Sequence, residues 1–217
     1  MMELYDLGRT THKAVPGMYR FIVDNAHDFV DGGLARDLVE QAKLRETDGH
    51  SIPQEYFSEM CRIWVEAYRQ GKFPIDFSQV VYADTIPRFQ KVRELGRDVG
   101  VLSSASRNFT ELFYEVPISA DQRLSDLVSE YFLGADIGDK DLPETHAGLW
   151  ERTEGGIYAI FDDKLSVCKA AHEGLSQAGG NSRIYLVDRK GQYAGEVLEE
   201  LAEKRITKVR SFDEVQD

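Results

Sequence analysis

Short apolar runs alternate with stretches of helical spacing along most of the chain. The runs are rich in Val, Ile, Leu, Phe and Tyr, which is typical of strands buried on both faces of a sheet; they lie at about 2–6, 99–102, 131–133, 157–161 and 183–187, with a further run near 208–209. Between them, apolar residues at three- to four-residue spacing predict helices at about 84–95, 107–115, 121–130, 164–177 and 194–203. This alternation predicts a mostly parallel sheet with helices on both faces.

Residues 14–75 differ from the rest because they have helical spacing and no strand-like run. We expect the last helix of this segment to start near Ser51, which can form a capping box with Gln54. That helix carries an apolar stripe of Phe57, Met60, Ile63, Trp64 and Ala67. The sequence therefore predicts an α/β fold, with a doubly wound, mostly parallel core domain at residues 1–13 and 76–217 and a helical cap domain inserted at residues 14–75.

Composition and net charge limit the kinds of molecule that the protein is expected to bind. The 217 residues are 42% hydrophobic and 29% charged, as in an ordinary globular protein. A net charge of −12 disfavours nucleic acid and anionic membrane surfaces as partners. No apolar run approaches the roughly 18 residues of a membrane span, and the N-terminus lacks the basic and apolar regions of a signal peptide. We expect a cytoplasmic protein with reduced cysteines at Cys61 and Cys168; the sequence indicates no oligomeric state.

Four short polar signals follow apolar runs in a fixed order. They are YDLGRT (5–10), VLSSAS (101–106), IGDK (137–140) and YAIFDDK (158–164). The carboxyl ends of parallel strands share one edge of the sheet, and ligands bind in the crevice there. We therefore expect Asp6, Ser103, Lys140 and Asp162 to converge. This set of groups suits a small phosphorylated substrate and a divalent cation.

Each signal has a chemical and a purely structural interpretation. Asp6 could attack phosphorus to form an aspartyl-phosphate, or it could simply form a turn. Ser103 and Ser104 could bind phosphoryl oxygens, although serines after a strand also serve as turn and cap residues. Lys140 could neutralise a phosphate and hold Asp6 ionised, or it could be an exposed loop lysine.

The adjacent carboxylates Asp162 and Asp163 are the sharpest signal for a metal. They repel one another unless a cation or a helix N-terminus relieves them. Mg²⁺ prefers one or two carboxylates together with water and phosphate oxygens, and Asp6 with Asp162 could supply them. We therefore predict Mg²⁺ as the cofactor. No pair of histidines has metal-binding spacing, and only His12 lies close to the first signal.

The four signals in this order resemble those of the haloacid dehalogenase superfamily, hydrolases with a Rossmann-like core, an aspartate nucleophile and usually Mg²⁺. The stretch VYADTIPRFQKVRELGRDVGVLSSASRNFTELFY, followed by EYF and IGDK, is most similar to the enolase-phosphatase branch. The resemblance covers the core well and the cap poorly. It implies that Asp6 is the nucleophile, that Ser103 and Lys140 bind the phosphoryl group, and that Asp162, supported by Asp163, ligates the metal. It also places the Gly8 carbonyl on the metal.

Two positions depart from that pattern. Phosphatases of this superfamily carry an acid two residues after the nucleophile, where this chain has Gly8, and relatives often carry another acid where it has Ser166. The first acid moves the proton, a contribution of roughly 10²–10⁴-fold. Three interpretations follow: a Mg²⁺-dependent phosphatase of a small phosphorylated metabolite without the usual acid, a phosphonate- or halide-cleaving relative, and a weakly active or inactive binding or regulatory protein.

Overall fold

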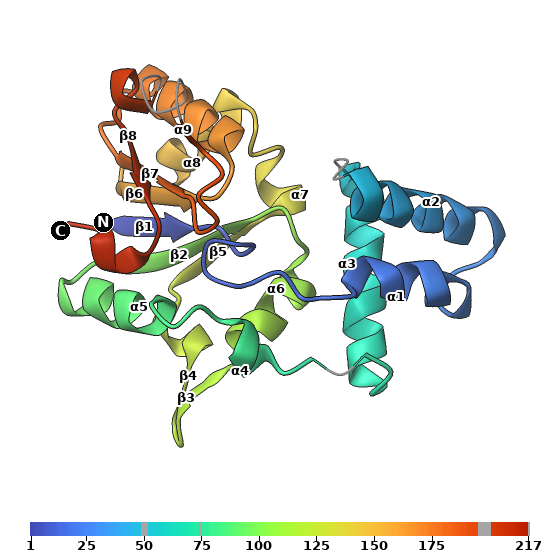
Figure 1. Ribbon diagram of the computed structural model, residues 1–217. Helices are drawn as coiled ribbons and strands as arrows, with labels where there is room; N and C mark the ends of the chain where they lie inside the picture. The colour runs from blue at the N-terminus through green and yellow to red at the C-terminus, as the bar shows by residue number, and fades with distance from the viewer. Residues whose placement is uncertain (49–51, 74, 195–200, 217) are drawn as a thin grey trace.

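The computed structural model describes residues 1–48, 52–73, 75–194 and 201–216. Within them, the main sheet has six strands in the order β5-β2-β1-β6-β7-β8 (Figure 1). Every neighbouring pair in this sheet is parallel, which confirms the predicted α/β architecture. The strands are β1 (Met2–Tyr5), β2 (Asp98–Ser103), β5 (Glu130–Leu133), β6 (Ile157–Asp162), β7 (Arg183–Val187) and β8 (Ile206–Val209).

The first strand lies in the middle of the sheet, between β2 and β6. Tyr5 is level with Val101 of β2 and with Phe161 of β6. The chain positions that follow Tyr5 and Phe161 are Asp6 and Asp162, so these two carboxylates leave the sheet at the same edge. The register of three strands therefore decides where the polar signals meet.

Helices cover both faces of the sheet, and Figure 1 shows α8 and α9 on one side with α5 and α6 on the other. Leu4 and Ile160 pack on the side of α8 and α9, in a cluster that includes Cys168. Tyr5 and Phe161 pack on the opposite side, where their rings stack with centroids 4.5 Å apart. The bounds of these helices are α5 (Thr85–Glu94), α6 (Arg107–Tyr114), α8 (Pro143–Arg152) and α9 (Leu165–Gln177).

A group of helices lies between β1 and β2 in the chain and beside the sheet in space, with no strand among the residues described there (Figure 1). These helices are α1 (Met18–Asn25), η1 (Ala26–Asp28), α2 (Gly32–Asp48) and α3 (Gln54–Arg69), followed by the short α4 (Phe77–Val80). The helical segment predicted from the spacing is therefore confirmed. Its role as a separate cap domain at residues 14–75 stays a prediction.

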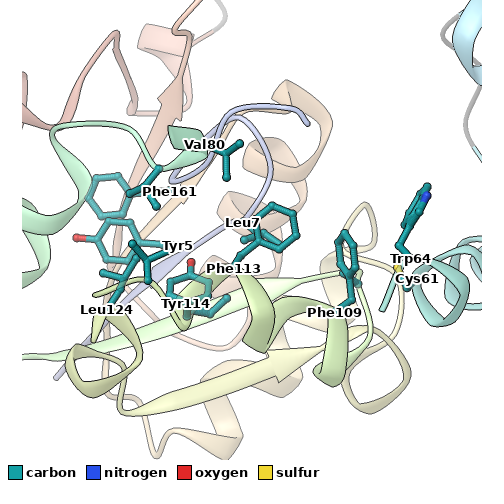
Figure 2. Close-up of a cluster of buried hydrophobic side chains, with 14 of the residues drawn as sticks. Tyr5, Leu7, Cys61, Trp64, Val80, Phe109, Phe113, Tyr114, Leu124 and Phe161 are labelled. Atoms are coloured by element: carbon teal, nitrogen blue, oxygen red, sulfur yellow. The ribbon is translucent and has the colours of Figure 1, made fainter. Parts of the chain in front are cut away.

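The helix α3 packs against α6 of the core. Trp64 of α3 lies against Phe109 of α6 with ring centroids 5.5 Å apart, and Figure 2 shows the two rings facing each other beside Cys61. Cys61 and Cys168 are both buried and free, as the sequence predicted. One apolar cluster runs from α3 into the core, because it contains Trp64, Phe109 and Tyr5 together. The helical group is therefore anchored on the core through α3.

The start of α3 differs from the sequence prediction. The helix begins at Gln54 with Pro53 at its N-cap, and no side chain caps it. Gln54 is therefore the first helical residue instead of the third, so it cannot complete a capping box; Ser51 lies outside the described residues. The amide of Gln54 instead donates to the carbonyl of Ser104 in the core.

Two further helix predictions have different outcomes, and one observed helix was not predicted. The helix predicted at 121–130 is wrong, since β3 (Pro117–Ser119) and β4 (Gln122–Arg123) form a hairpin there, followed by η2 (Leu124–Leu127). The Asp126 carboxylate accepts the Arg123 N–H at 2.7 Å, which closes a tight turn in place of a helix. Most of the helix predicted at 194–203 lies outside the described residues. The helix α8 was not predicted. In the described part of the chain, no helix is long and apolar enough to cross a membrane.

Candidate functional site

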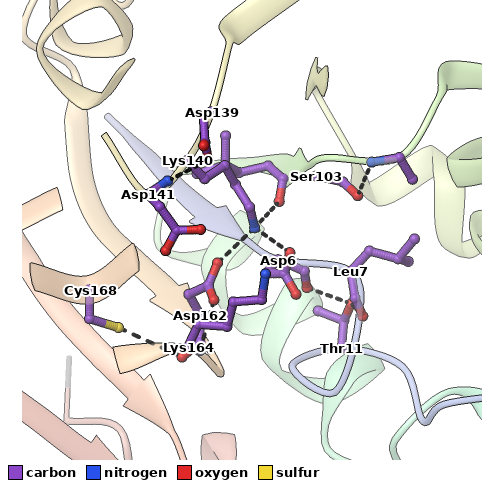
Figure 3. Close-up of polar contacts among 12 residues, drawn as sticks. Asp6, Leu7, Thr11, Ser103, Asp139, Lys140, Asp141, Asp162, Lys164 and Cys168 are labelled. Atoms are coloured by element: carbon purple, nitrogen blue, oxygen red, sulfur yellow. Dashed lines mark hydrogen bonds and ion pairs between the residues drawn. The ribbon is translucent and has the colours of Figure 1, made fainter. Parts of the chain in front are cut away.

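The ammonium group of Lys140 lies between two carboxylates at the carboxyl edge of the sheet. Its Nζ atom is 2.5 Å from Asp6 Oδ1 and 2.7 Å from Asp162 Oδ2 (Figure 3). The Lys140 side chain is only 4% exposed, so these ion pairs are shielded from solvent. The predicted convergence of the first, third and fourth polar signals is therefore present, and Lys140 is not an exposed loop lysine.

Local structure explains how Lys140 reaches this position. The strand β5 ends at Leu133, and the short helix α7 (Gly134–Ile137) carries the chain above the sheet edge. His146 of α8 contacts the Lys140 carbonyl through its Nε2 atom at 2.8 Å, and this contact fixes the backbone of Lys140. The Lys140 ammonium also lies 3.5 Å from the carbonyl of Leu102 in β2. The amine is thus held by groups from three neighbouring strands.

The two predicted serines lie at the end of β2. Ser103 is buried, and its hydroxyl accepts the N–H of Ala105 at 3.1 Å, which shapes the loop (Figure 3). Ser104 is half-buried, and its carbonyl accepts a hydrogen bond from Gln54 at 2.7 Å. Ser103 keeps a hydroxyl proton with which it can donate to an anion. The structure therefore places Ser103 on the strand next to Asp6, while Ser104 contributes to the contact with α3.

Three carboxylates form a cluster that suits a divalent cation. One oxygen from each of Asp6, Asp162 and Asp163 lies within 4.8 Å of the others. Asp162 is 1% exposed, whereas Asp163 is half-buried. The N–H of Lys164 donates to Asp162 Oδ1 at 2.9 Å and fixes its orientation. Hard carboxylate oxygens are the donors that Mg²⁺ prefers, so this set fits the predicted metal.

Burial and mutual repulsion disfavour the ionised forms of Asp6 and Asp163. Burial raises the pKa of Asp6 to about 7, although Lys140 opposes the rise, and Asp162 adds to it. Burial and the neighbouring Asp162 likewise raise the pKa of Asp163 to about 6. Burial alone would lower the pKa of Lys140, but the carboxylates of Asp162 and Asp6 outweigh it, so the pKa is raised and the amine stays protonated. A bound cation would relieve the remaining repulsion.

Gly8 leaves an opening beside Asp6. The residue is exposed, and a β-carbon built on it would lie 3.9 Å from Asp6 Oδ2. The turn takes its left-handed residue at Arg9, whose φ is 59°, so position 8 has a backbone that other residues can adopt. Position 8 can therefore hold an acidic side chain, and this chain has none there. Ser166, the second departure, is exposed in the first turn of α9.

Several residues that support the site were not predicted. The Thr11 hydroxyl lies 3.0 Å from the Asp6 carbonyl and 3.1 Å from the Leu7 carbonyl, so it holds the turn after β1. Arg9 opposes the rise that burial and Asp162 cause in the pKa of Asp163. The Tyr193 hydroxyl donates to the Asp163 carbonyl at 3.2 Å. Of these residues only Thr11 left a signal, because a threonine hydroxyl can bond back to a backbone carbonyl about four residues earlier in the chain.

His12 makes contacts within the fold and does not belong to the cluster of Asp6, Lys140 and Asp162. Its Nε2 atom contacts the Phe113 carbonyl at 2.9 Å, and its Nδ1 atom contacts the Thr11 hydroxyl at the same distance. Burial lowers the pKa of His12 to about 3, so the imidazole is neutral at physiological pH. Since Phe113 accepts from Nε2, the His12 ring has no proton to offer a substrate near Asp6.

No protein-family model and no curated protein matches the chain. The structure is similar to several solved structures at low sequence identity. The UTR4 protein of Saccharomyces cerevisiae aligns with a TM-score of 0.59 at 16% identity, over 99% of both chains. A Bacteroides fragilis protein named as a haloacid dehalogenase-like hydrolase aligns with a TM-score of 0.59 at 15% identity, over 97% of both chains.

A third solved structure contains a phosphorylated sugar. It is a variant of CbbY from Rhodobacter sphaeroides in complex with xylulose-1,5-bisphosphate. It aligns with a TM-score of 0.59 at 12% identity, over 98% of this chain and 95% of CbbY. At such identities the similarity concerns the fold, which is the Rossmann-like α/β fold of the haloacid dehalogenase superfamily.

Proposed function

We propose that this chain, which has the fold of the haloacid dehalogenase superfamily, is a Mg²⁺-dependent phosphatase that works through an aspartyl-phosphate on Asp6. The observation that carries the proposal is the buried Lys140 ammonium, held 2.5 Å from Asp6 and 2.7 Å from Asp162. A shared fold hosts many reactions, so the activity is argued from these residues.

The two oxygens of Asp6 have different surroundings. Oδ1 is engaged by the Lys140 ammonium, whereas Oδ2 faces the open side at Gly8. We assign Oδ2 as the nucleophile. It forms a bond to phosphorus while the bond between phosphorus and the ester oxygen breaks, and the electron pair of that bond leaves with the alkoxide. Hydrolysis is thereby divided into two steps, each with a lower barrier.

The phosphoryl group needs positive charge and hydrogen-bond donors. The Lys140 ammonium supplies charge at the sheet edge, and the Ser103 hydroxyl and the loop after β2 supply donors. Asp6, Asp162 and Asp163 would hold Mg²⁺, and we propose the Gly8 carbonyl as a further ligand. When bound, the ion supplies positive charge that offsets the charge on the phosphoryl oxygens.

The second half of the reaction restores Asp6. Water attacks phosphorus, the bond to Asp6 Oδ2 breaks, and inorganic phosphate leaves. An acid at position 8 would protonate the leaving alkoxide in the first step and take a proton from water in the second. Gly8 can do neither, so the alkoxide must take its proton from solvent or from the substrate in the first step, and solvent must accept the proton of the attacking water in the second. We therefore propose a slow phosphatase that favours substrates with good leaving groups.

The substrate class is a small phosphorylated metabolite. The sugar bisphosphate held by CbbY supports this class as a general type, because CbbY has the same fold. The more specific proposal is the enolase-phosphatase branch, and its support is the sequence stretch from Val81 to Lys140, which resembles that branch. Helices α1 to α3 would act as the cap that selects the substrate, and we propose the cytoplasm as its location.

Gly8 also favours a second function, that of a binding or regulatory protein that takes a phosphorylated ligand without turnover. A halide-cleaving enzyme is less well supported, since the carboxylate cluster of Asp6, Asp162 and Asp163 suits a metal. Hydrolysis of a panel of phosphate esters with Mg²⁺, compared between the wild type and Asp6→Asn, separates these functions. We expect slow turnover that is lost in Asp6→Asn. Equal background rates in the two proteins would contradict the phosphatase and favour the binding or regulatory protein.

A further inference from the structure

The side chain of Gln54 connects the helical group to the loop that follows β2. Gln54 is the first residue of α3, and its Nε2 atom donates to the Ser104 carbonyl at 2.7 Å. The same amide lies 3.3 Å from the Ser58 hydroxyl one turn further along α3. Ser104 directly follows Ser103, the residue that we place at the phosphoryl group. Gln54 thus bonds to the backbone beside that residue.

The loop has a second contact with α3. Burial raises the pKa of the Cys61 thiol on the same helix, and Ser106, the N-cap residue of α6, opposes that rise, so the two residues lie close together. Trp64 of α3 packs on Phe109 of α6 just beyond it. The loop at 103–106 therefore lies under α3, with Gln54 contacting one end of it and Cys61 the other. The apolar contact between Trp64 and Phe109 holds α3 in place. The Gln54 amide is therefore not needed to hold the helix, and its bond acts on the loop.

A third segment approaches the same hydrogen bond. A β-carbon built on Gly134 would lie 2.7 Å from the Ser104 carbonyl oxygen and 2.8 Å from Gln54 Nε2. Real β-carbons do not approach backbone atoms so closely, so this position requires glycine. Gly134 begins α7, the helix that leads to Lys140. The cap helix, the serine loop and the segment that carries Lys140 therefore meet at one carbonyl group.

We propose that Gln54 is a positioning residue that fixes the loop at 103–106 and thereby keeps Ser103 in place for a phosphoryl group. The inference rests on the phosphatase site proposed above. Gln54 has no capping role to explain its position, because α3 has no side-chain cap. Its amide bonds instead to a backbone carbonyl 50 residues away in the sequence. The bond is exposed, so its loss affects the order of the loop more than the stability of the whole protein.

The test compares two glutamines on the same helix. Gln54→Ala removes the bond to Ser104, whereas the control Gln70→Ala removes an exposed bond from Gln70 to Glu66 at the far end of α3. Gln54→Glu keeps the shape but places a carboxylate oxygen against the Ser104 carbonyl. We expect both Gln54 variants to speed amide hydrogen exchange at Ala105, whose N–H donates to Ser103, while Gln70→Ala leaves that rate unchanged.

Inorganic phosphate is the probe of the site. We expect its affinity, measured by calorimetry with Mg²⁺, to fall about fivefold in Gln54→Ala and by at least as much in Gln54→Glu, with the melting temperature close to that of wild type. Gly134→Ala, which must displace the same hydrogen bond, should have the same direction of effect. Unchanged exchange at Ala105, or unchanged phosphate affinity, in the Gln54 variants would overturn the proposal.

The two proposals fail in different ways. Hydrogen exchange needs no ligand and no turnover, so it tests the effect of Gln54 on the loop even in a protein that hydrolyses nothing. A wild type that binds phosphate through the serine loop without hydrolysis would defeat the phosphatase and leave the role of Gln54 intact. A wild type with full activity and a Gln54→Ala variant identical to Gln70→Ala would defeat only the role of Gln54.

Discussion

Asp6 Oδ2 lies 3.9 Å from the position that a β-carbon on Gly8 would occupy. The proposed nucleophile therefore faces the position where the family resemblance leads us to expect a proton donor and where this chain has glycine. Gly8 is exposed, so water has access to this side of the carboxylate. In the proposed reaction, this relationship makes proton transfer, and not the placement of the phosphoryl group, the slow step.

Replacing Gly8 with aspartate should restore the missing acid. We expect Gly8→Asp to raise hydrolysis of alkyl phosphate esters about 100-fold, because an alkoxide leaves poorly without a proton. Steady-state rates with Mg²⁺ give the measurement. Gly8→Asn is the matched control, since it has the same shape and cannot transfer the proton. Equal rates for the two variants would show that the site lacks more than this acid.

Replacing Lys140 with methionine should leave two buried carboxylates without their cation. Removing one partner of a buried ion pair costs about 3–5 kcal/mol of stability, and we expect a loss of this order in urea unfolding at pH 8 without metal. Mg²⁺ should recover part of the loss through the same carboxylates. The exposed Arg20 pair with Asp24 supplies a control, because Arg20→Met should change stability by less than about 1 kcal/mol. A similar small effect of Lys140→Met would contradict the ion-pair geometry.

The raised pKa of Asp6 predicts a pH-dependent stability in the absence of metal. The folded protein holds a proton on Asp6 up to about pH 7, whereas the unfolded chain releases it near 3.8. Between these values the folded state binds more protons, so Asp6 makes stability fall as pH rises through this window. Asp6→Asn should therefore be more stable than wild type at pH 8, by a few kcal/mol at most, with the difference shrinking toward pH 4.

Unfolding of the two proteins in urea across this pH range makes the measurement. Mg²⁺ should stabilise wild type and have little effect on Asp6→Asn, which lacks one of the three carboxylates. The effect of His12 on stability is opposite in sign to that of Asp6, since its lowered pKa makes stability fall as pH drops below about 6.5. This effect is the same in both proteins, so it cancels when their stabilities are compared. A variant that is less stable than wild type at pH 8 would contradict the raised pKa of Asp6.

The sequence predicted the convergence of Asp6, Lys140 and Asp162 because the topology of the sheet determines most of it. Asp6 and Asp162 each follow an apolar run, and in a parallel sheet the ends of such runs share an edge. Lys140 follows the short α7 and not a strand directly, so its place beside Asp6 depends on that helix as well.

What the sequence did not indicate depends on packing between distant segments. The Gln54 amide reaches the Ser104 carbonyl because α3 packs on α6. The local spacing of Ser51 and Gln54 predicted a capping box instead. The region 121–130 has helical spacing at Leu124 and Leu127, yet this spacing also suits the 3-10 turn that Asp126 closes. Short elements of this kind are decided by single side-chain contacts, which periodicity does not show.

The most direct test of the account is the pre-steady-state reaction with p-nitrophenyl phosphate. Its leaving group departs without a proton, so Asp6 should be phosphorylated quickly, while the second step stays slow for want of a base at position 8. We predict a burst of p-nitrophenol close to one equivalent of enzyme, with the phosphoryl group located on Asp6 by peptide mass spectrometry after an acid quench. No burst should occur in Asp6→Asn. A wild type without a burst, and without phosphate on Asp6, would contradict the proposed reaction.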